Sequence, residues 1–179
     1  MTLANRLQQL IRTVPDWPKP GIQFRDLTPV FQDAACWREV VGFFADRFRN
    51  SGLHAVAGIE ARGFLLGSVL AHQLGVAFVP IRKAGKLPFR TISRDYALEY
   101  GSATLEVHAD GCRPGDRVLL VDDLIATGGT LLAAFDLLEQ LGAQVAEAAA
   151  IIDLPELGGS ARCRERGLSV CTLIDYAGH

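Results

Sequence analysis

One short segment, Val118–Thr130, carries the residue types best suited to binding a sugar phosphate. An apolar run ends in Asp122 and Asp123, two more apolar residues follow, and Ala126-Thr127-Gly128-Gly129-Thr130 comes next. Glycines allow successive backbone N–H groups to converge on one point, and a helix starting there adds its own N–H groups and dipole. The two threonines add hydroxyl donors. The segment therefore predicts that a turn binds a monophosphate while the two acids accept hydrogen bonds from ribose hydroxyls.

Two other interpretations of this segment are weaker. An ordinary strand-to-helix turn could carry two exposed acids, but such a turn does not need this series of small, glycine-rich residues. A triphosphate site of the Walker type is not indicated, because the sequence contains no GxxxxGK[ST] motif.

The elements around this segment alternate in a regular way. Short apolar runs predict buried strands, amphipathic stretches predict helices, and Gly142 is typical of the residue that follows a helix. Such alternation predicts an α/β fold with a mostly parallel central sheet flanked by helices, whose ligands bind at the carboxyl ends of the strands. The predicted strands are 55–59, 76–81, 117–121, 145–153 and 170–174, and the predicted helices are 37–50, 64–74 and 131–141.

Two regions depart from this alternation. Residues 13–30 carry four prolines, which predicts an irregular cap over the edge of the sheet, within a small N-terminal hood of about residues 1–30. Residues 83–108 predict a flexible loop followed by a two-stranded flap that turns near Gly101. We find no linker, so we expect residues 1–179 to form a single domain.

Composition narrows the possible partners and compartment. The chain has 179 residues, 49% of them hydrophobic, and a formal net charge of -2, so nothing general favours a nucleic acid or an anionic membrane. We find no membrane-spanning run and no signal peptide, and we expect a cytoplasmic protein. The four cysteines form no CxxC pair and lack histidines at metal-ligand spacing, so we expect reduced thiols packed as small apolar groups.

The segment Val118–Thr130 resembles, at every position, the phosphoribosyl-diphosphate motif of type I phosphoribosyltransferases. The resemblance implies that family's fold and its reaction, in which a phosphoribosyl group passes from 5-phosphoribosyl-1-diphosphate to a nitrogenous base. It also implies Mg²⁺ bound mainly through the diphosphate substrate, with no direct protein ligand, and a homodimer.

Three further stretches resemble the adenine phosphoribosyltransferases within this family. They are Gly58–Phe64, which is similar to the diphosphate loop; the RKAGKLP and LEYG segments at 82–88 and 98–101; and Pro20–Pro29, which is similar to the adenine-binding cap. The likeness extends from Val14 to His179 and includes Leu157-Gly158-Gly159 and the terminal Ala-Gly-His. The function that it implies is purine salvage: adenine and phosphoribosyl diphosphate are converted to AMP and diphosphate.

The resemblance also implies roles for individual residues. Glu99 and Arg62 would be catalytic, and a cis peptide bond would lie between Glu60 and Ala61. Gln23 departs from the apolar residue that we expect there, although the adenine contact at that position is made by the backbone. The phosphoribosyl group would contact Asp122, Asp123, Ala126, Thr127, Gly128, Gly129 and Thr130; the diphosphate Glu60, Ala61, Arg62, Arg82, Lys83, Lys86 and Tyr100; and adenine Gln23, Phe24, Arg25 and Leu124.

Two other functions remain open from the residues alone. The base could be a 6-oxopurine or a pyrimidine, because the sequence does not reveal which backbone atoms face it. A regulator that senses phosphoribosyl diphosphate and binds DNA or RNA could keep the same motif. The slightly negative charge and the absence of an added helix-turn-helix segment disfavour that regulator.

Overall fold

The computed structural model describes residues 1–97 and 102–177. Its helices are α1 (Leu3–Leu10), α2 (Thr28–Gln32), α3 (Ala34–Phe48), α4 (Arg62–Leu74), α5 (Gly129–Gln140) and α6 (Gly159–Glu165), with a 3-10 turn η1 (Pro155–Leu157). Its strands are β1 (Arg12–Pro15), β2 (Gln23–Asp26), β3 (Ala55–Ile59), β4 (Ala77–Lys83), β5 (Thr91–Ala97), β6 (Ser102–His108), β7 (Arg117–Val121), β8 (Leu124–Ile125), β9 (Gln144–Asp153) and β10 (Val170–Asp175).

The central sheet is mostly parallel, as the sequence predicts. Its strands follow the order β10-β9-β7-β3-β4-β6-β5, and β8 pairs with β9 beside this path. The pairs from β10 to β4 are parallel, whereas β6 runs antiparallel to both β4 and β5. The carboxyl ends of β3, β4 and β7 therefore meet at one edge, where the candidate site lies.

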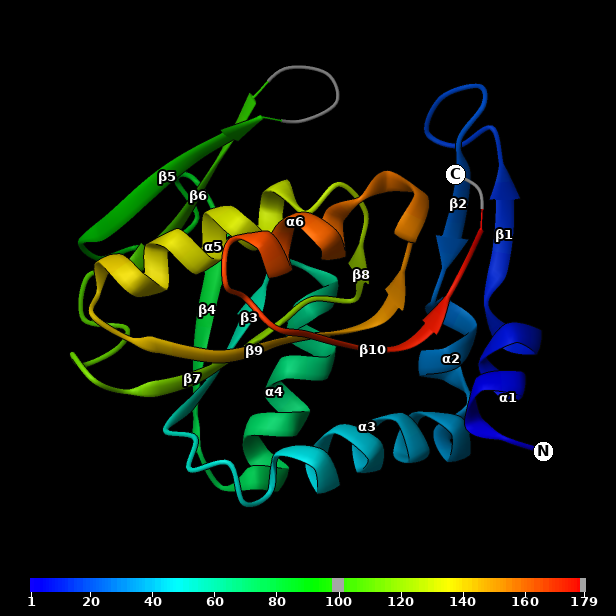
Figure 1. The fold of residues 1–179 in the computed structure, drawn as a ribbon, viewed down its shortest axis with the longest axis horizontal. Coiled ribbons are helices and arrows are strands. Elements are labelled where there is room, and N and C mark those ends of the chain that lie inside the picture. Colours follow the sequence, from blue (N-terminus) through cyan, green and yellow to red (C-terminus); the bar gives the residue numbers. More distant parts are fainter. Residues whose placement is uncertain (98–101, 178–179) are drawn as a thin grey trace.

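Alternate residues of the central strands pack into two separate cores. Val56 of β3 and Leu119 of β7 belong to the core under α3 and α4, whereas Ala57 and Leu120 belong to the core under α5. Because successive side chains of a strand point to opposite faces, a strand covered on both sides must be apolar throughout. Figure 1 shows α3 and α4 on one side of the sheet and α5 and α6 on the other.

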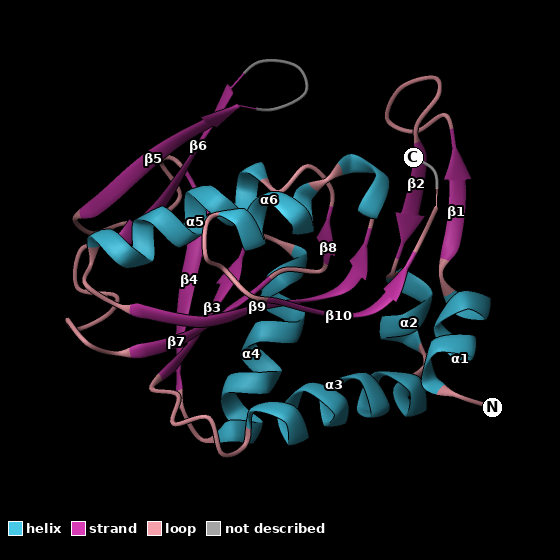
Figure 2. Ribbon diagram, in the orientation of Figure 1, coloured by secondary structure: helices cyan, strands magenta, loops and turns pink. Residues whose placement is uncertain are grey.

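The N-terminal region is more regular than the sequence predicts. Instead of an irregular cap, β1 and β2 form an antiparallel two-stranded sheet, and α2 follows directly. The prolines do not interrupt these strands, because Pro15 ends β1, Pro18 and Pro20 lie in the connection, and Pro29 lies in the first turn of α2, where its missing N–H has no helical partner. In Figure 2 this hairpin and the β5–β6 hairpin project to the same side of the molecule.

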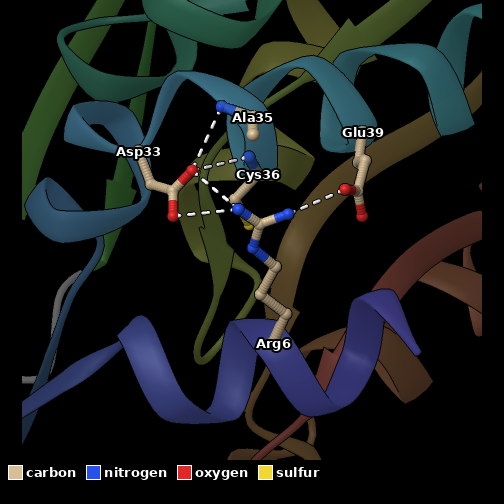
Figure 3. Close-up of polar contacts among 5 residues, drawn as sticks. All are labelled: Arg6, Asp33, Ala35, Cys36 and Glu39. Carbon is tan, nitrogen blue, oxygen red and sulfur yellow. Dashed lines mark hydrogen bonds and ion pairs between the residues drawn. The ribbon is translucent and has the colours of Figure 1, made fainter. Parts of the chain in front are cut away.

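Polar contacts attach helix α1 to helix α3. Arg6 donates to both carboxylate oxygens of Asp33, at 2.9 and 3.0 Å, and to Glu39 at 2.8 Å (Figure 3). Asp33 also caps α3 by accepting from the amides of Ala35 and Cys36. The hydrogen bond from the Cys36 amide, followed by that from Arg6, lowers the pKa of the Asp33 carboxyl. These contacts, together with the fully buried Leu7, hold α1 against α3, and the hairpin begins directly after α1.

The β5–β6 hairpin corresponds to the predicted flap. Its strands pair from Thr91 with His108 to Ala97 with Ser102, and the predicted turn at Gly101 lies outside the described residues. The four cysteines are free and buried, as predicted. None of the helices in the described part of the chain is long and apolar enough to cross a membrane.

Candidate active site

A cavity of about 480 Å³ opens at the carboxyl ends of β3, β4 and β7. It lies at the edge where parallel sheets bind ligands, and both the two acids and the glycine-rich turn of the predicted phosphate motif contribute to it. Its lining also includes charged groups of both signs, as binding of a sugar diphosphate requires. The lining residues are Glu60, Ala61, Arg62, Lys83, Tyr96, Asp122, Asp123, Leu124, Ile125, Ala126, Thr127, Gly128, Thr130 and Leu131.

The turn from Ala126 to Thr130 leads directly into α5, which starts at Gly129, two residues earlier than the sequence predicts. Gly128 has φ +81°, a left-handed conformation that other residues rarely adopt, and its carbonyl accepts the first helical bond, from Leu132 at 2.9 Å. Among the described residues, no protein acceptor receives a hydrogen bond from the N–H groups between Ala126 and Thr130. The turn therefore presents a row of free donors at the positive end of a helix, which is a site for an anion.

The two acids of the motif differ in environment. Asp123 is 5% exposed and forms an ion pair with the Nε of Arg62. Asp122 lies beside it, and its Oδ1 accepts the amide of Asp123 at 2.9 Å. Burial, and then the charge of Asp123, raise the pKa of Asp122 well above its usual value. A ligand with hydroxyl groups would relieve this repulsion by donating hydrogen bonds to the carboxylates.

Residues at the ends of β3 and β4 form a second charged cluster. Glu60 accepts from the guanidinium of Arg82 at 3.0 and 3.3 Å, and from the amide of Lys83 at 3.1 Å. Burial alone would raise the pKa of Glu60, but these hydrogen bonds outweigh it and hold the pKa below its usual value. Arg82 also donates to the carbonyl of Lys86 at 2.9 Å, so its side chain holds the loop after β4 in place.

Known proteins with the same sequence pattern identify the family. Residues 31–162 match the phosphoribosyl transferase domain. The adenine phosphoribosyltransferase of Paracidovorax citrulli (strain AAC00-1) is 61% identical over 181 residues, covering 100% of this chain and 98% of that protein. That of Albidiferax ferrireducens (strain T118) is 59% identical, with 100% and 93% covered. The chain belongs to the adenine phosphoribosyltransferase family.

Solved structures of adenine phosphoribosyltransferases share the whole fold. The enzyme of Rhodothermus marinus is 45% identical with a TM-score of 0.90, and covers 97% of this chain and 98% of its own. The enzyme of Trypanosoma brucei, in complex with AMP, pyrophosphate and ribose-5-phosphate, is 31% identical with a TM-score of 0.89, with 98% and 80% covered. The predicted type I phosphoribosyltransferase fold is thereby confirmed.

The loop after β3 has the backbone expected of adenine phosphoribosyltransferases. The peptide bond between Glu60 and Ala61 is cis, as the resemblance predicts, and α4 begins at the next residue, Arg62. The Arg62 guanidinium bonds Asp123 and also lies 5.4 Å from the centre of the Phe24 ring. One side chain thus connects the diphosphate loop, the phosphoribosyl motif and the N-terminal hairpin.

The predicted adenine-binding residues of the family lie on two separate elements. Leu124 lines the cavity, whereas Gln23, Phe24 and Arg25 lie on β2, outside the set that lines it. Phe24 packs edge-to-face on Trp17, with ring centres 4.4 Å apart, and its ring also contacts Arg62, which lines the cavity. The structure therefore brings most of the residues predicted to bind the phosphoribosyl group and the diphosphate into one cavity, whereas Arg82, Lys86 and Gly129 do not line it.

The side chain of Arg25 contacts the C-terminal segment. It donates to Thr13 and, at 3.3 Å, to the carbonyl of Ala177, and its guanidinium lies 4.5 Å from the centre of the Tyr176 ring. Figure 1 shows the described chain after β10 running beside β2. The side chain of Arg25 is therefore held by Thr13 and by the segment that follows β10.

Sequence reasoning missed one residue that lines the cavity and one that supports the loop after β4. Tyr96 of β5 lines the cavity, and its place just before the LEYG segment was the available signal. Glu106 of β6 is only 6% exposed and accepts the amides of Lys86 and Leu87, both at 2.9 Å. Burial alone would raise the pKa of Glu106, but these backbone hydrogen bonds outweigh it and lower the pKa. Nothing local marks this glutamate, because its partners lie twenty residues away.

Two predicted residues, Glu99 and Tyr100, lie outside the described residues. Within residues 1–97 and 102–177, the structure contains no group of three or more histidine, cysteine, aspartate or glutamate side chains placed to hold a metal ion.

Proposed function

We propose that the protein transfers the 5-phosphoribosyl group of 5-phosphoribosyl-1-diphosphate to adenine, yielding AMP and diphosphate in purine salvage. One observation carries this proposal: a single cavity joins the free amides of the Ala126–Thr130 turn, the acids Asp122 and Asp123, and the cations Arg62 and Lys83. These three groups match, in order along one ligand, a 5′-phosphate, two ribose hydroxyls and a diphosphate. The family relatives named adenine phosphoribosyltransferase support adenine as the base.

The 5′-phosphate would bind the amides of Ala126, Thr127, Gly128, Gly129 and Thr130, with the two threonine hydroxyls as further donors. The free N–H groups and the start of α5 support this role. Fixing the phosphate at one end of the cavity places C1′ at a constant distance from the turn. The reaction then proceeds from a positioned complex instead of a chance collision.

Asp122 and Asp123 would accept hydrogen bonds from the 2′- and 3′-hydroxyls of the ribose. Burial and the neighbouring charge of Asp123 raise the pKa of Asp122, so the ionised pair has an electrostatic cost that further hydrogen-bond donors would reduce. Ribose hydroxyls would supply such donors. Binding would therefore relieve part of the unfavourable interaction between the two acids.

Arg62 would stabilise the departing diphosphate. It contacts Asp123 through Nε, and among the described residues its two terminal NH₂ groups have no protein acceptor, so both can bind phosphate oxygens. Lys83, the backbone at Glu60 and Ala61, and Lys86 would add to this field, whereas the ion pair with Glu60 suits Arg82 to holding the loop. Tyr100 keeps its predicted role at the diphosphate.

The cavity fits Mg²⁺ that binds mainly through substrate oxygens. Its carboxylates are Glu60, Asp122 and Asp123, and two of these are paired with arginines, which leaves few free protein oxygens for a metal. When bound, Mg²⁺ supplies positive charge that neutralises the diphosphate. The protein groups position the diphosphate and exclude water around it.

In the proposed reaction the C1′–O bond to diphosphate breaks and a bond from purine N9 to C1′ forms on the opposite face. The base would lie between Phe24 and Leu124, with the backbone of Gln23 and Arg25 contacting its edge. Glu99 would accept the purine proton during AMP synthesis and return it in the reverse direction. The contact of Phe24 with Trp17 supports a rigid stacking surface for adenine.

We further propose a cytoplasmic homodimer whose subunits are single domains over residues 1–179, each with a hood, about residues 1–30, and a flexible loop and flap, about residues 83–108. Exposed apolar side chains on two neighbouring helices support the dimer: Phe43 on α3 is 41% exposed, and Leu65 on α4 is 46% exposed. Light scattering of the purified protein would report the mass directly.

Release of diphosphate tests the proposed function. The purified protein is incubated with phosphoribosyl diphosphate, Mg²⁺ and one base at a time: adenine, hypoxanthine, guanine or uracil. We expect diphosphate and AMP to form with adenine alone. Comparable turnover of hypoxanthine would assign another base, and binding of phosphoribosyl diphosphate without turnover of any base would favour a regulator.

A further inference from the structure

The back of the Ala126–Thr130 turn is held by residues of the segment Leu157–Arg162, which the proposed mechanism does not use. Arg162 of α6 donates through Nε to the carbonyl of Thr127 at 2.9 Å, and through Nη2 to the same carbonyl and to that of Leu157, the latter at 2.7 Å. The amide of Gly159 donates to the carbonyl of Ala126 at 3.1 Å. Two successive carbonyls of the turn are therefore bound from the same side.

These contacts determine where the amides of the turn point. In a planar trans peptide the carbonyl and the N–H group point in opposite directions. When Arg162 binds the carbonyl of Thr127, the N–H of Gly128 must point away from α6. When Gly159 binds the carbonyl of Ala126, the N–H of Thr127 must do the same. Both Thr127 and Gly128 line the cavity, so the bound carbonyls direct free donors into it.

Close packing adds to this effect. A methyl group at Gly159 would clash with the carbonyl oxygen of Ala126 and lie 2.6 Å from the nitrogen of Gly128. Only a glycine lets η1 and α6 approach the turn so closely. The turn therefore packs directly against the backbone of Gly159, while the guanidinium of Arg162 binds the carbonyl of Thr127.

We propose that Arg162, with Gly159, is a positioning residue that holds the turn in the conformation that binds the 5′-phosphate. This inference rests on the proposed function, because it assigns that phosphate to the turn. A guanidinium suits the task, since its planar fork can bind two carbonyls at once, whereas a lysine ammonium is a single point charge. The side chain of Arg162 is exposed, so replacing it should leave the fold intact.

Comparing AMP with adenosine isolates the contribution of the phosphate. Titration calorimetry gives the dissociation constants of both ligands for the wild-type protein and for Arg162→Met, Arg162→Lys and Gly159→Ala, while thermal melting checks folding. Arg164→Met is the matched control: it removes an arginine from the same helix, and in the described structure Arg164 makes no hydrogen bond to the turn.

We expect Arg162→Met to weaken AMP binding about tenfold, the size expected for loss of charge-assisted hydrogen bonds, without changing adenosine binding. Arg162→Lys should fall between Met and wild type, Gly159→Ala should resemble Met, and Arg164→Met should match wild type.

Three results would overturn the positioning role. They are wild-type AMP affinity in Arg162→Met, equal losses for AMP and adenosine in that variant, and full recovery by lysine, which would mean that charge alone matters. If instead the wild-type protein itself binds AMP no better than adenosine, the phosphate site of the proposed function is wrong.

Discussion

Replacing Arg62 with alanine should lower both stability and activity, for two separable reasons. The variant leaves Asp123 without its ion-pair partner, and the side chains of the pair are 48% and 7% exposed for Arg62 and Asp123. Exposed pairs contribute up to about 1 kcal/mol, whereas removing one partner of a buried pair costs roughly 3–5 kcal/mol. With one partner half in solvent, we expect the free energy of unfolding to fall by about 1.5 kcal/mol and the melting temperature by about 4 °C.

The catalytic loss should be larger. Removing one preorganised donor to a developing negative charge typically lowers turnover about 100-fold, so kcat/KM for phosphoribosyl diphosphate should fall by about that factor. Thermal melting and steady-state kinetics on the same preparation measure the two effects separately.

Arg47→Ala is the matched control for this variant. Arg47 pairs with Glu147 through side chains 47% and 16% exposed, and neither residue lines the cavity. We expect a similar loss of stability with wild-type kinetics. Unchanged kinetic constants in Arg62→Ala would refute its role at the diphosphate, and an unchanged melting temperature would refute the ion-pair argument.

Three further changes test other parts of the site. Glu99→Gln should lower turnover by at least about 100-fold while the dissociation constant of phosphoribosyl diphosphate stays within about twofold, because only the proton transfer is lost; equal turnover in both proteins would exclude Glu99 from the mechanism. Phe24→Ala should raise the KM for adenine about tenfold through lost stacking and leave the KM for phosphoribosyl diphosphate unchanged. Steady-state kinetics with each substrate varied in turn measure both constants, and the opposite pattern would contradict the stacking role. The folded pKa of Glu106 is lowered, so its stabilisation is present above the ordinary glutamate pKa of about 4.3 and is lost as pH falls through the folded pKa. The melting temperature should therefore decline less steeply with acidification in Glu106→Gln than in wild type. Parallel declines in the two proteins would contradict this.

The sequence predicts the strands of the central sheet well because burial on both faces leaves a plain signal. β3 and β7 have the predicted bounds, since Ala55–Ile59 and Arg117–Val121 are short apolar runs between polar turns. The start of α5 was placed two residues late, because the backbone of Gly129 and Thr130 is already helical while their types indicate a turn.

The N-terminal hairpin was harder to predict for a physical reason. All four residues of β2 are half-buried, so the strand shows no alternation of apolar and polar residues. Four prolines nearby also argued against regular structure, although each lies where its missing N–H costs nothing. This segment forms a strand because it pairs with β1, and no local sequence pattern reveals that pairing.

The residue types of the site follow from its motifs, but their partners do not. Arg62 pairs with Asp123, which is sixty-one residues away in the sequence, and Arg82 pairs with Glu60, which is twenty-two residues away. Such pairs depend on which strand ends the topology brings together. The same is true of Arg162, whose role at the turn depends on the return of the chain through β9 and η1.

A crystal structure of the protein with bound AMP tests the central claim most directly. We predict that the phosphate oxygens lie within hydrogen-bonding distance of the amides between Ala126 and Thr130, with the ribose hydroxyls on Asp122 and Asp123. A phosphate bound elsewhere, with those amides bonded to the protein's own groups, would contradict it.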